Sequence, residues 1–157
     1  MKSLFFALLL TFMNSSTSQN SSVILKQFIQ DIIGAKLSDT EITDRYFCTN
    51  LLHRADSKGE LARRYLQFAL SQQRGLLQEK HLKLDEVKFA PYSTLSPSEL
   101  PAKPFHLLNE TENVFISQYH GEIICYFLVQ DDKIASTLLI NQGGENYFIN
   151  FCTGYPM

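Results

Sequence analysis

The chain has 157 residues, of which 45% are hydrophobic, and a formal net charge of -2 at pH 7. This length and apolar content are typical of one globular domain and argue against a disordered chain. Because positive charge neither predominates nor gathers into a stripe, the composition also argues against a nucleic-acid-binding protein.

The N-terminal segment has the pattern of an export signal. Lys2 supplies the positive start, Leu4–Met13 is an apolar run of about ten residues, and Asn14–Ser18 is small and polar. The run is too short to span a bilayer, which takes about twenty apolar residues, although an uncleaved anchor is the alternative. We therefore predict a signal peptide over 1–18, a single domain over 19–157, and a secreted or periplasmic protein with no membrane attachment after cleavage.

Three helices are predicted to follow. Leu25–Ile33 carries apolar residues at helical spacing, and Ser38–Glu41 is a capping box that opens a second helix. Ser57–Glu60 reads as another capping box, and it opens the longest helix, which we expect to end near Lys80. The side chains expected to form the buried stripe of this helix are Leu61, Tyr65, Phe68, Ala69, Gln72 and Leu76.

The rest of the chain reads as mainly β-structure. Leu84–Phe89 alternates loosely and is predicted to be an edge strand, and Pro91–Pro104 is predicted to be a long loop, which is typical either of a functional segment or of an element that the pattern does not reveal. Beyond the loop, short turn signals separate four runs rich in β-forming residues, which predict an antiparallel meander. The four runs are Asn113–Tyr119, Glu122–Gln130, Lys133–Asn141 and Glu145–Cys152.

Pairing these strands outward from two-residue turns sets Ile116 opposite Cys125 and sorts the side chains into two faces. The face expected to meet the helices holds Val114, Ile116, Ile123, Cys125, Phe127, Val129, Ile134, Leu138, Ile140, Tyr147, Ile149 and Phe151, with Gln118 and Ser136 as its main polar members. The outer face holds the interface candidates Phe115, Tyr119, Tyr126, Leu128 and Phe148. Apolar surface of this extent favours an interface, most simply in a homodimer. The alternative is that the proline-rich loop or the strand before it covers the outer face.

Three cysteines allow at most one internal disulfide. In the predicted register Cys125 and Cys152 lie on opposite faces, two strands or roughly 9.5 Å apart, which is too far for a bond. A disulfide would therefore use Cys48, and the hypothesis we carry forward is Cys48–Cys125. The alternative is that the cysteines are small buried hydrophobic residues.

The order of elements resembles the cone-shaped α+β superfamily of ketosteroid isomerase and nuclear transport factor two. The resemblance rests on the helical stripes at Leu25–Ile33 and Leu61–Leu76 and on the ending GEIICYFLVQDDKIASTLLINQGGENYFINF, which is similar to small exported bacterial members of the superfamily. It implies a cystatin-like cone, with two to three N-terminal helices packed on a curved antiparallel meander. It also implies a pocket between helices and sheet, and often dimers formed through the outer face of the sheet. The resemblance is architectural and implies no single activity.

The expected function is therefore that of an exported small binding protein for an apolar ligand or a protein. Candidate pocket residues are Tyr46, Tyr65, Gln118, Ser136 and Tyr147. One alternative is a lyase or isomerase in the cone pocket, but the inner face of the meander offers no carboxylate, so an acid would have to come from Glu41, Asp44, Asp85 or Glu86. The other alternative is a secreted inhibitor or immunity-type protein. No catalytic residue, metal ligand or cofactor is assigned, because the histidines and cysteines lack ligand spacing.

Overall fold

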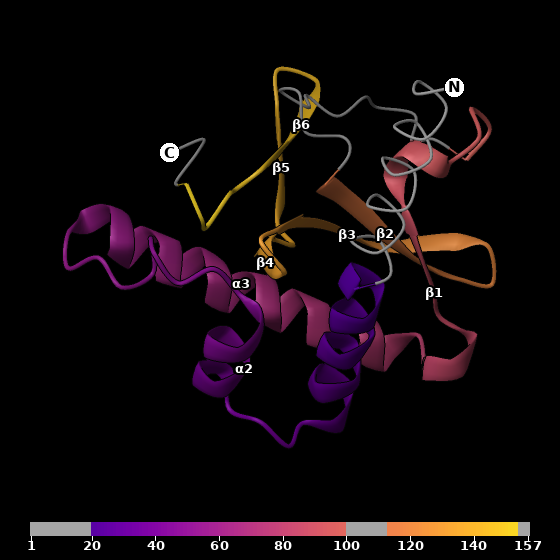
Figure 1. Ribbon diagram of the computed structural model, residues 1–157, viewed down its shortest axis with the longest axis horizontal. Coiled ribbons are helices and arrows are strands. Elements are labelled where there is room, and N and C mark those ends of the chain that lie inside the picture. Colours follow the sequence, from indigo (N-terminus) through magenta and orange to yellow (C-terminus); the bar gives the residue numbers. More distant parts are fainter. Residues whose placement is uncertain (1–19, 100–112, 154–157) are drawn as a thin grey trace, which may run out of the picture.

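The computed structural model describes residues 20–99 and 113–153, so the predicted signal peptide and the distal part of the proline-rich loop lie outside it. The described residues form an α+β fold, which confirms the predicted class. Figure 1 shows the helices on one side of a four-stranded sheet, with a separate β-hairpin at the opposite end of the molecule. Among the described residues, no helix combines the length and the apolar character needed to cross a bilayer.

All three predicted helices are confirmed, and the cap of the third differs from the prediction. Residues 20–34 form the first helix, and α2 spans Asp39–Tyr46 behind the predicted capping box of Ser38 and Glu41. The third helix, α3, spans Ser57–Glu79, but its N-cap is Asp56, whose side chain accepts a hydrogen bond from the Gly59 N–H. The predicted capping box at Ser57 is therefore wrong by one residue, because the carboxylate of Asp56 satisfies the free backbone donor first.

The strands form two sheets rather than one meander. The larger sheet has the order β1 (Lys88–Pro91), β2 (Val114–Tyr119), β3 (Glu122–Gln130) and β4 (Lys133–Ser136), all antiparallel. The smaller sheet is a hairpin of β5 (Leu139–Gln142) and β6 (Glu145–Phe148). Short 3-10 turns at Leu84–Glu86 and Tyr92–Thr94 flank β1, so the predicted edge strand exists but begins later than expected.

The predicted third run divides because a serine interrupts it. The Ser136 hydroxyl accepts a hydrogen bond from the Leu138 N–H at 3.1 Å and donates one to the Leu138 carbonyl at 3.2 Å. A side chain that binds the backbone two residues ahead offers the chain an alternative to the strand ladder. The chain therefore leaves the larger sheet at Ser136, and among the described strands β5 pairs with β6 alone.

The predicted register is wrong in β2 because of a bulge. Gln118 pairs with Ile123 but Ser117 pairs with Cys125, so the ladder passes over Ile124. Everything in β2 before the bulge faces the opposite way from the prediction, since one extra residue exchanges the two faces of a strand. Phe115 consequently lies in the main core, and Val114 lies on the other side of the sheet. A second register shift lies between Leu128 and Val129 of β3. Val129 pairs with Ile134 but Leu128 pairs with Ser136, so the ladder passes over Ala135 of β4.

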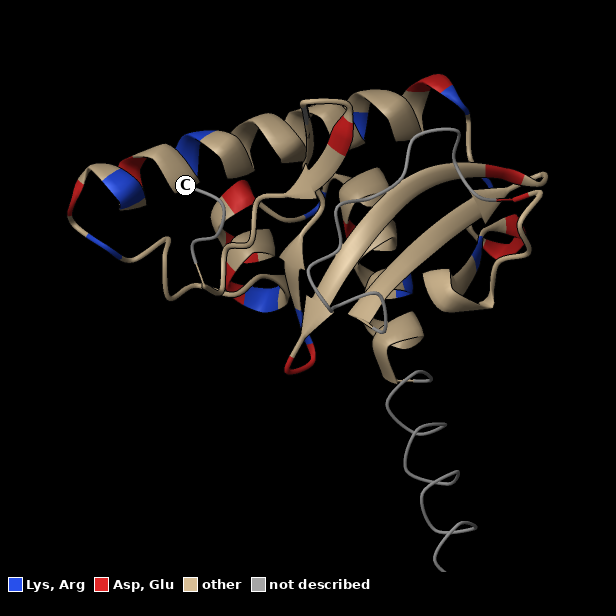
Figure 2. Ribbon diagram, turned by 90° about the horizontal axis from the view of Figure 1, so that it is seen from above, with Lys and Arg blue, Asp and Glu red and all other residues tan. Residues whose placement is uncertain are grey.

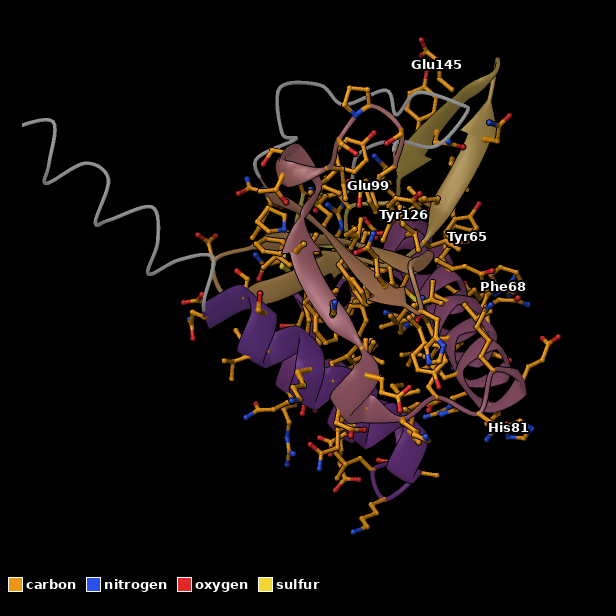
Figure 3. All side chains as sticks on the ribbon, turned by 90° about the vertical axis from the view of Figure 1, so that its right-hand side faces the viewer. Tyr65, Phe68, His81, Glu99, Tyr126 and Glu145 are labelled. Carbon is orange, nitrogen blue, oxygen red and sulfur yellow. A yellow bond between two sulfur atoms is a disulfide. The ribbon has the colours of Figure 1, made fainter. Side chains whose placement is uncertain are left out.

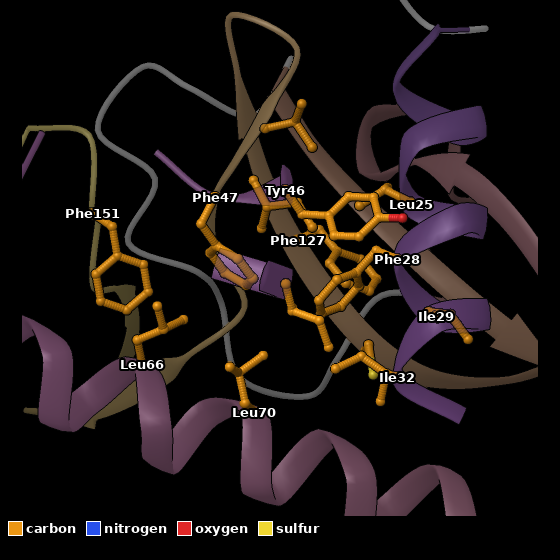
Figure 4. Close-up of a cluster of buried hydrophobic side chains, with 14 of the residues drawn as sticks. Leu25, Phe28, Ile29, Ile32, Tyr46, Phe47, Leu66, Leu70, Phe127 and Phe151 are labelled. Atoms are coloured by element: carbon orange, nitrogen blue, oxygen red, sulfur yellow. The ribbon is translucent and has the colours of Figure 1, made fainter. Parts of the chain in front are cut away.

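The main core fills the space between the three helices and the larger sheet. Phe28 of the first helix lies at its centre and makes edge-to-face contacts with Tyr46 and Phe47 at 5.6 Å and with Phe127 at 6.1 Å between ring centroids. Figure 4 shows these rings together with Leu66 and Leu70 of α3. The predicted stripe of the first helix is confirmed except at Ile33, which is 37% exposed, because its other four apolar residues are buried. They are Leu25, Phe28, Ile29 and Ile32.

The outer face of the sheet is closed by the chain itself. Leu128 and Phe148 are buried in a second cluster with Val114 and Ala135. The side chains that pack on this cluster from around it are Cys48, Tyr92, Tyr126, Leu139 and Cys152. The prediction that this face is an exposed apolar interface is therefore wrong, and the alternative of a covering segment holds in part, since Tyr92 follows directly after β1.

The predicted stripe of α3 is also wrong, by about one residue. The buried side of α3 consists of Gly59, Ala62, Leu66, Ala69, Leu70, Gln73 and Leu77. Of the predicted residues only Ala69 is fully buried, whereas Leu61 is 41% and Phe68 53% exposed. The helix carries two apolar stripes side by side. The stripe that includes Ala62, Leu66 and Leu70 is the one buried in the core.

The disulfide joins Cys48 to Cys152, with their Cα atoms 5.0 Å apart. The Cys48–Cys125 hypothesis is wrong, because Cys125 lies free and buried under α3, whereas Cys48 follows α2 to the rim of the second cluster. The expectation that a bond would use Cys48 holds.

Candidate functional site

A groove between α2 and α3 is the strongest candidate site in the described part of the chain. It has a volume of about 210 Å³. Its floor is formed by Leu52, Leu66 and Leu70, which are all buried. Its polar rim consists of Asp39, Thr40, Thr43, Asp44, His53, Arg63 and Gln67. A hollow with an apolar floor and a polar rim is the usual form of a site for a small amphiphilic group.

The loop after α2 supplies one wall of the groove, and α3 holds that loop in place. Arg63 donates hydrogen bonds from its Nη1 to the carbonyl of Leu52 at 2.6 Å and to that of Arg54 at 2.9 Å. The Arg54 Nε donates to the Asp56 carboxylate at 3.0 Å, which ties the end of the loop to the N-cap of α3. The position of Leu52 and His53 is therefore fixed by backbone groups that Arg63 holds.

The acidic residues of α2 differ in their electrostatic surroundings. Asp39 forms an ion pair with Arg74 of α3, and the Thr43 hydroxyl donates to its backbone carbonyl at 2.7 Å. Asp44 is exposed, and its carboxylate forms no ion pair with any described residue. Asp44 is thus the carboxylate of the groove that is available to a ligand.

Lys133 closes the C-terminal end of α2. Its ammonium donates to the carbonyls of Asp44 at 3.3 Å and Arg45 at 2.6 Å. A cation at this end of a helix compensates the partial negative charge of the last carbonyls. Because Lys133 binds carbonyls of the backbone, this interaction does not occupy the Asp44 carboxylate.

The pocket residues predicted from the sequence are not brought together, and none of the five lines the groove. Tyr46 is buried on the other side of α2, where its hydroxyl donates to Asp31 of the first helix at 2.5 Å. Burial raises the pKa of Tyr46, and the bond to Asp31 raises it further. Ser136 is buried against Leu138, and Tyr65 and Gln118 are half-buried in other places. The Tyr147 hydroxyl donates to Glu145 in the hairpin.

The acids that the sequence offers for an enzymatic reaction are also dispersed. Asp44 lines the groove, but the Glu41 carboxylate accepts hydrogen bonds from the backbone N–H and hydroxyl of Ser38, which lower its pKa. Glu86 lies near the far end of the sheet, where it contacts His120 at 2.6 Å, and this contact lowers the pKa of Glu86. In the described residues, no group of three histidines, cysteines or acids is placed to hold a metal ion.

A polar contact is buried inside the main core. The Cys125 thiol donates to Gln73 of α3 at 2.9 Å, and Ser117 lies opposite Cys125 on β2. Burial raises the pKa of Cys125 to about 11. The thiol is therefore protonated at neutral pH, whereas the thiolate is the reactive form of cysteine.

The comparisons with known proteins give no further guide. No family model, no curated protein and no solved structure matches the chain.

Only part of this groove could be predicted from the sequence. The sequence predicts the capping box that starts α2, and Asp44 is one of the acids that it offers as candidates. Leu66 and Leu70 were missed because the other stripe of α3 was expected to be buried. The position of the loop depends on Arg63 and on two backbone carbonyls, which leave no pattern in a sequence.

Proposed function

We propose that the protein is an exported binding protein whose ligand site is the groove between α2 and α3. The ligand has a short apolar part, which lies on the leucine floor, and a positively charged end, which lies beside Asp44. The observation that supports this proposal is the groove itself, with its apolar floor and its one carboxylate outside any ion pair with a described residue.

The size of the groove limits the ligand. About 210 Å³ holds a group of a few carbon atoms and is smaller than the clefts that bury a drug-sized molecule. The polar rim offers threonine hydroxyls and a carboxylate on the α2 side, which suit a hydrogen-bond donor. An alkylammonium group, free or at the end of a side chain, has this chemistry.

Export is supported by two features. Leu4–Met13 has the composition of a signal-peptide core. The Cys48–Cys152 bond is of the kind that forms and persists in oxidising compartments outside the cytoplasm. The likeness to the ketosteroid isomerase and nuclear transport factor two superfamily remains a prediction, and the proposed site does not depend on it.

The test is a titration of the ¹⁵N-labelled protein with hexylammonium chloride, followed by NMR. We expect shifts for amides of α2 and of the middle of α3, with weak saturable binding. Asp44→Asn should weaken hexylammonium binding about two- to five-fold, which corresponds to an exposed ion pair. Hexan-1-ol, which has the same alkyl chain and no charge, should bind the wild type and the variant equally.

Asp131→Asn is the matched control, because it removes the same charge at the exposed turn between β3 and β4. It should leave hexylammonium binding unchanged. Chemical-shift changes spread over the whole surface would contradict the proposal. So would an equal loss of hexylammonium affinity in Asp44→Asn and Asp131→Asn.

A further inference from the structure

We propose that α3 forms an antiparallel homodimer through its exposed apolar stripe. This inference is independent of the proposed ligand site, since the stripe and the groove use different sides of the helix. The outer face of the sheet, where the sequence predicts self-association, is closed by the chain itself, so a second copy has to use another surface.

The stripe has the spacing of a helix-pairing seam. Leu61, Tyr65, Phe68 and Gln72 follow one another at intervals of four, three and four residues. This spacing keeps the four side chains on one side of the helix, where they can meet a second helix. Leu61 is 41% and Phe68 53% exposed, whereas Tyr65 is half-buried and packs against the main core. Figure 3 shows Tyr65 and Phe68 on the flank of α3 that is away from the first helix.

The charges of α3 lie toward its ends. From Tyr65 to Gln73 the helix has no charged side chain, and Figure 2 shows the uncharged middle of this helix between blue and red ends. A single exposed apolar residue is common on protein surfaces, but a neutral helix segment of about 13 Å is suited to close contact with another neutral segment. The same segment of α3 in a second copy of the chain is a neutral surface of this kind.

The two ends of the seam fit an antiparallel pair. Steps of seven residues, toward the N-terminus from Tyr65 and toward the C-terminus from Gln72, lead to Lys58 at the start of the helix and Glu79 at its end. Both are exposed, and neither forms an ion pair with any described residue. When two copies pair about a twofold axis near Phe68, Lys58 of each lies next to Glu79 of the other. A parallel pair would place like charges together at each end.

The other charges beside the seam are already paired within the chain. Arg64 pairs with Glu60, Arg74 with Asp39, and Lys80 with Glu122. The association therefore does not bring uncompensated like charges together. One helix pair is at the small end of specific interfaces, so we expect a dissociation constant on the order of 10 to 100 μM.

The test is sedimentation equilibrium of the full chain over a concentration series. The average molar mass of the wild type should rise from that of a monomer toward that of a dimer as the protein concentration increases. Phe68→Lys should remain monomeric throughout. Val23→Lys is the matched control, because Val23 is 54% exposed on the first helix and lies outside the stripe. It should dimerise like the wild type, and circular dichroism should show that both variants are folded.

The antiparallel arrangement has its own test. Lys58→Glu should weaken the dimer several-fold, and adding Glu79→Lys should restore it, because the exchange re-forms both terminal ion pairs. A wild type that stays monomeric at millimolar concentration overturns the proposal. So does a dimer that Phe68→Lys leaves intact. A double variant that remains as weak as Lys58→Glu alone overturns the antiparallel pairing.

Discussion

Gly59 of α3 lies directly against the loop that follows α2. A Cβ atom at this position would lie 2.1 Å from the carbonyl oxygen of Arg54, which Arg63 holds by a hydrogen bond. No real contact is so short, so any larger residue would force the loop away from the helix. Gly75, in the same helix, is different, because a Cβ there would meet nothing within 4 Å.

Alanine at these two glycines should therefore have opposite effects. Gly59→Ala should lower the free energy of unfolding by about 1 to 3 kcal/mol, as overpacking does. Gly75→Ala should raise it by about 0.5 to 1 kcal/mol, because alanine is the better helix former. Urea unfolding of the two variants beside the wild type measures both changes. A stabilising Gly59→Ala would show that the loop is not held against the helix.

Single residues also show where the sequence was insufficient. Phe115 and Val114 are neighbours of similar character, and only the bulge at Ser117 and Gln118 decides which of them faces the helices. A bulge depends on the partner strand, which a pattern along one strand does not contain. Cys48 was the cysteine expected to form a bond, but its partner depended on where the C-terminal segment lies.

The three helices illustrate when a pattern is decisive. The first helix has one apolar side, and its buried residues could be predicted. The capping box of α2 was predicted to the residue, because its hydrogen bonds are local. In α3 two apolar stripes run side by side, and helical periodicity does not say which of them meets the core. The groove was missed for this reason, since its floor belongs to the stripe that was not expected to be buried.

The N-cap of α3 should make the protein sensitive to acid. The hydrogen bonds from Arg54 and from the Gly59 N–H lower the pKa of Asp56 from 3.8 to about 2. A carboxylate with a depressed pKa stabilises the fold when it is ionised, so its contribution is complete above about pH 4. The contribution should decrease as the pH falls from about 4 to 2, where Asp56 takes up a proton.

Asp56→Asn removes the negative charge but keeps the helix cap, because asparagine caps a helix about as well as aspartate. The variant should melt at a lower temperature than the wild type at pH 6, and the difference should shrink toward pH 2. Thermal unfolding over this range measures it. A difference that stays constant down to pH 2 would show that Asp56 keeps its ordinary pKa in the folded protein.

The molecule as a whole consists of a helix-covered sheet and a hairpin joined to it. Within the described residues, the β5–β6 hairpin shares no strand pairing with the larger sheet. Phe151, directly after the hairpin, is fully buried in the main core, and its N–H donates to the Ala135 carbonyl at 2.8 Å. The α+β class and the order of the strands could be predicted, but the division into two sheets could not, because it depends on how Ser136 binds Leu138.

The disulfide fastens this C-terminal segment to the rest of the protein. It closes a loop between residues 104 positions apart in the sequence. In the chain-entropy model a loop of this size stabilises the fold by about 4 to 5 kcal/mol, because it restricts the unfolded chain. For a domain of ordinary marginal stability this is a large share of the total.

Reduction should therefore lower the free energy of unfolding by about that amount, and Cys48→Ser should have the same effect without reductant. Hydrogen exchange should accelerate most in β6 and in the residues up to Cys152, because the bond joins this segment to the end of α2. Cys125→Ala is the control. It removes the buried thiol that contacts Gln73, so its cost should be the same with and without reductant. Equal stability of the oxidised and reduced wild type would mean that packing around Phe151 alone holds the C-terminal segment in place.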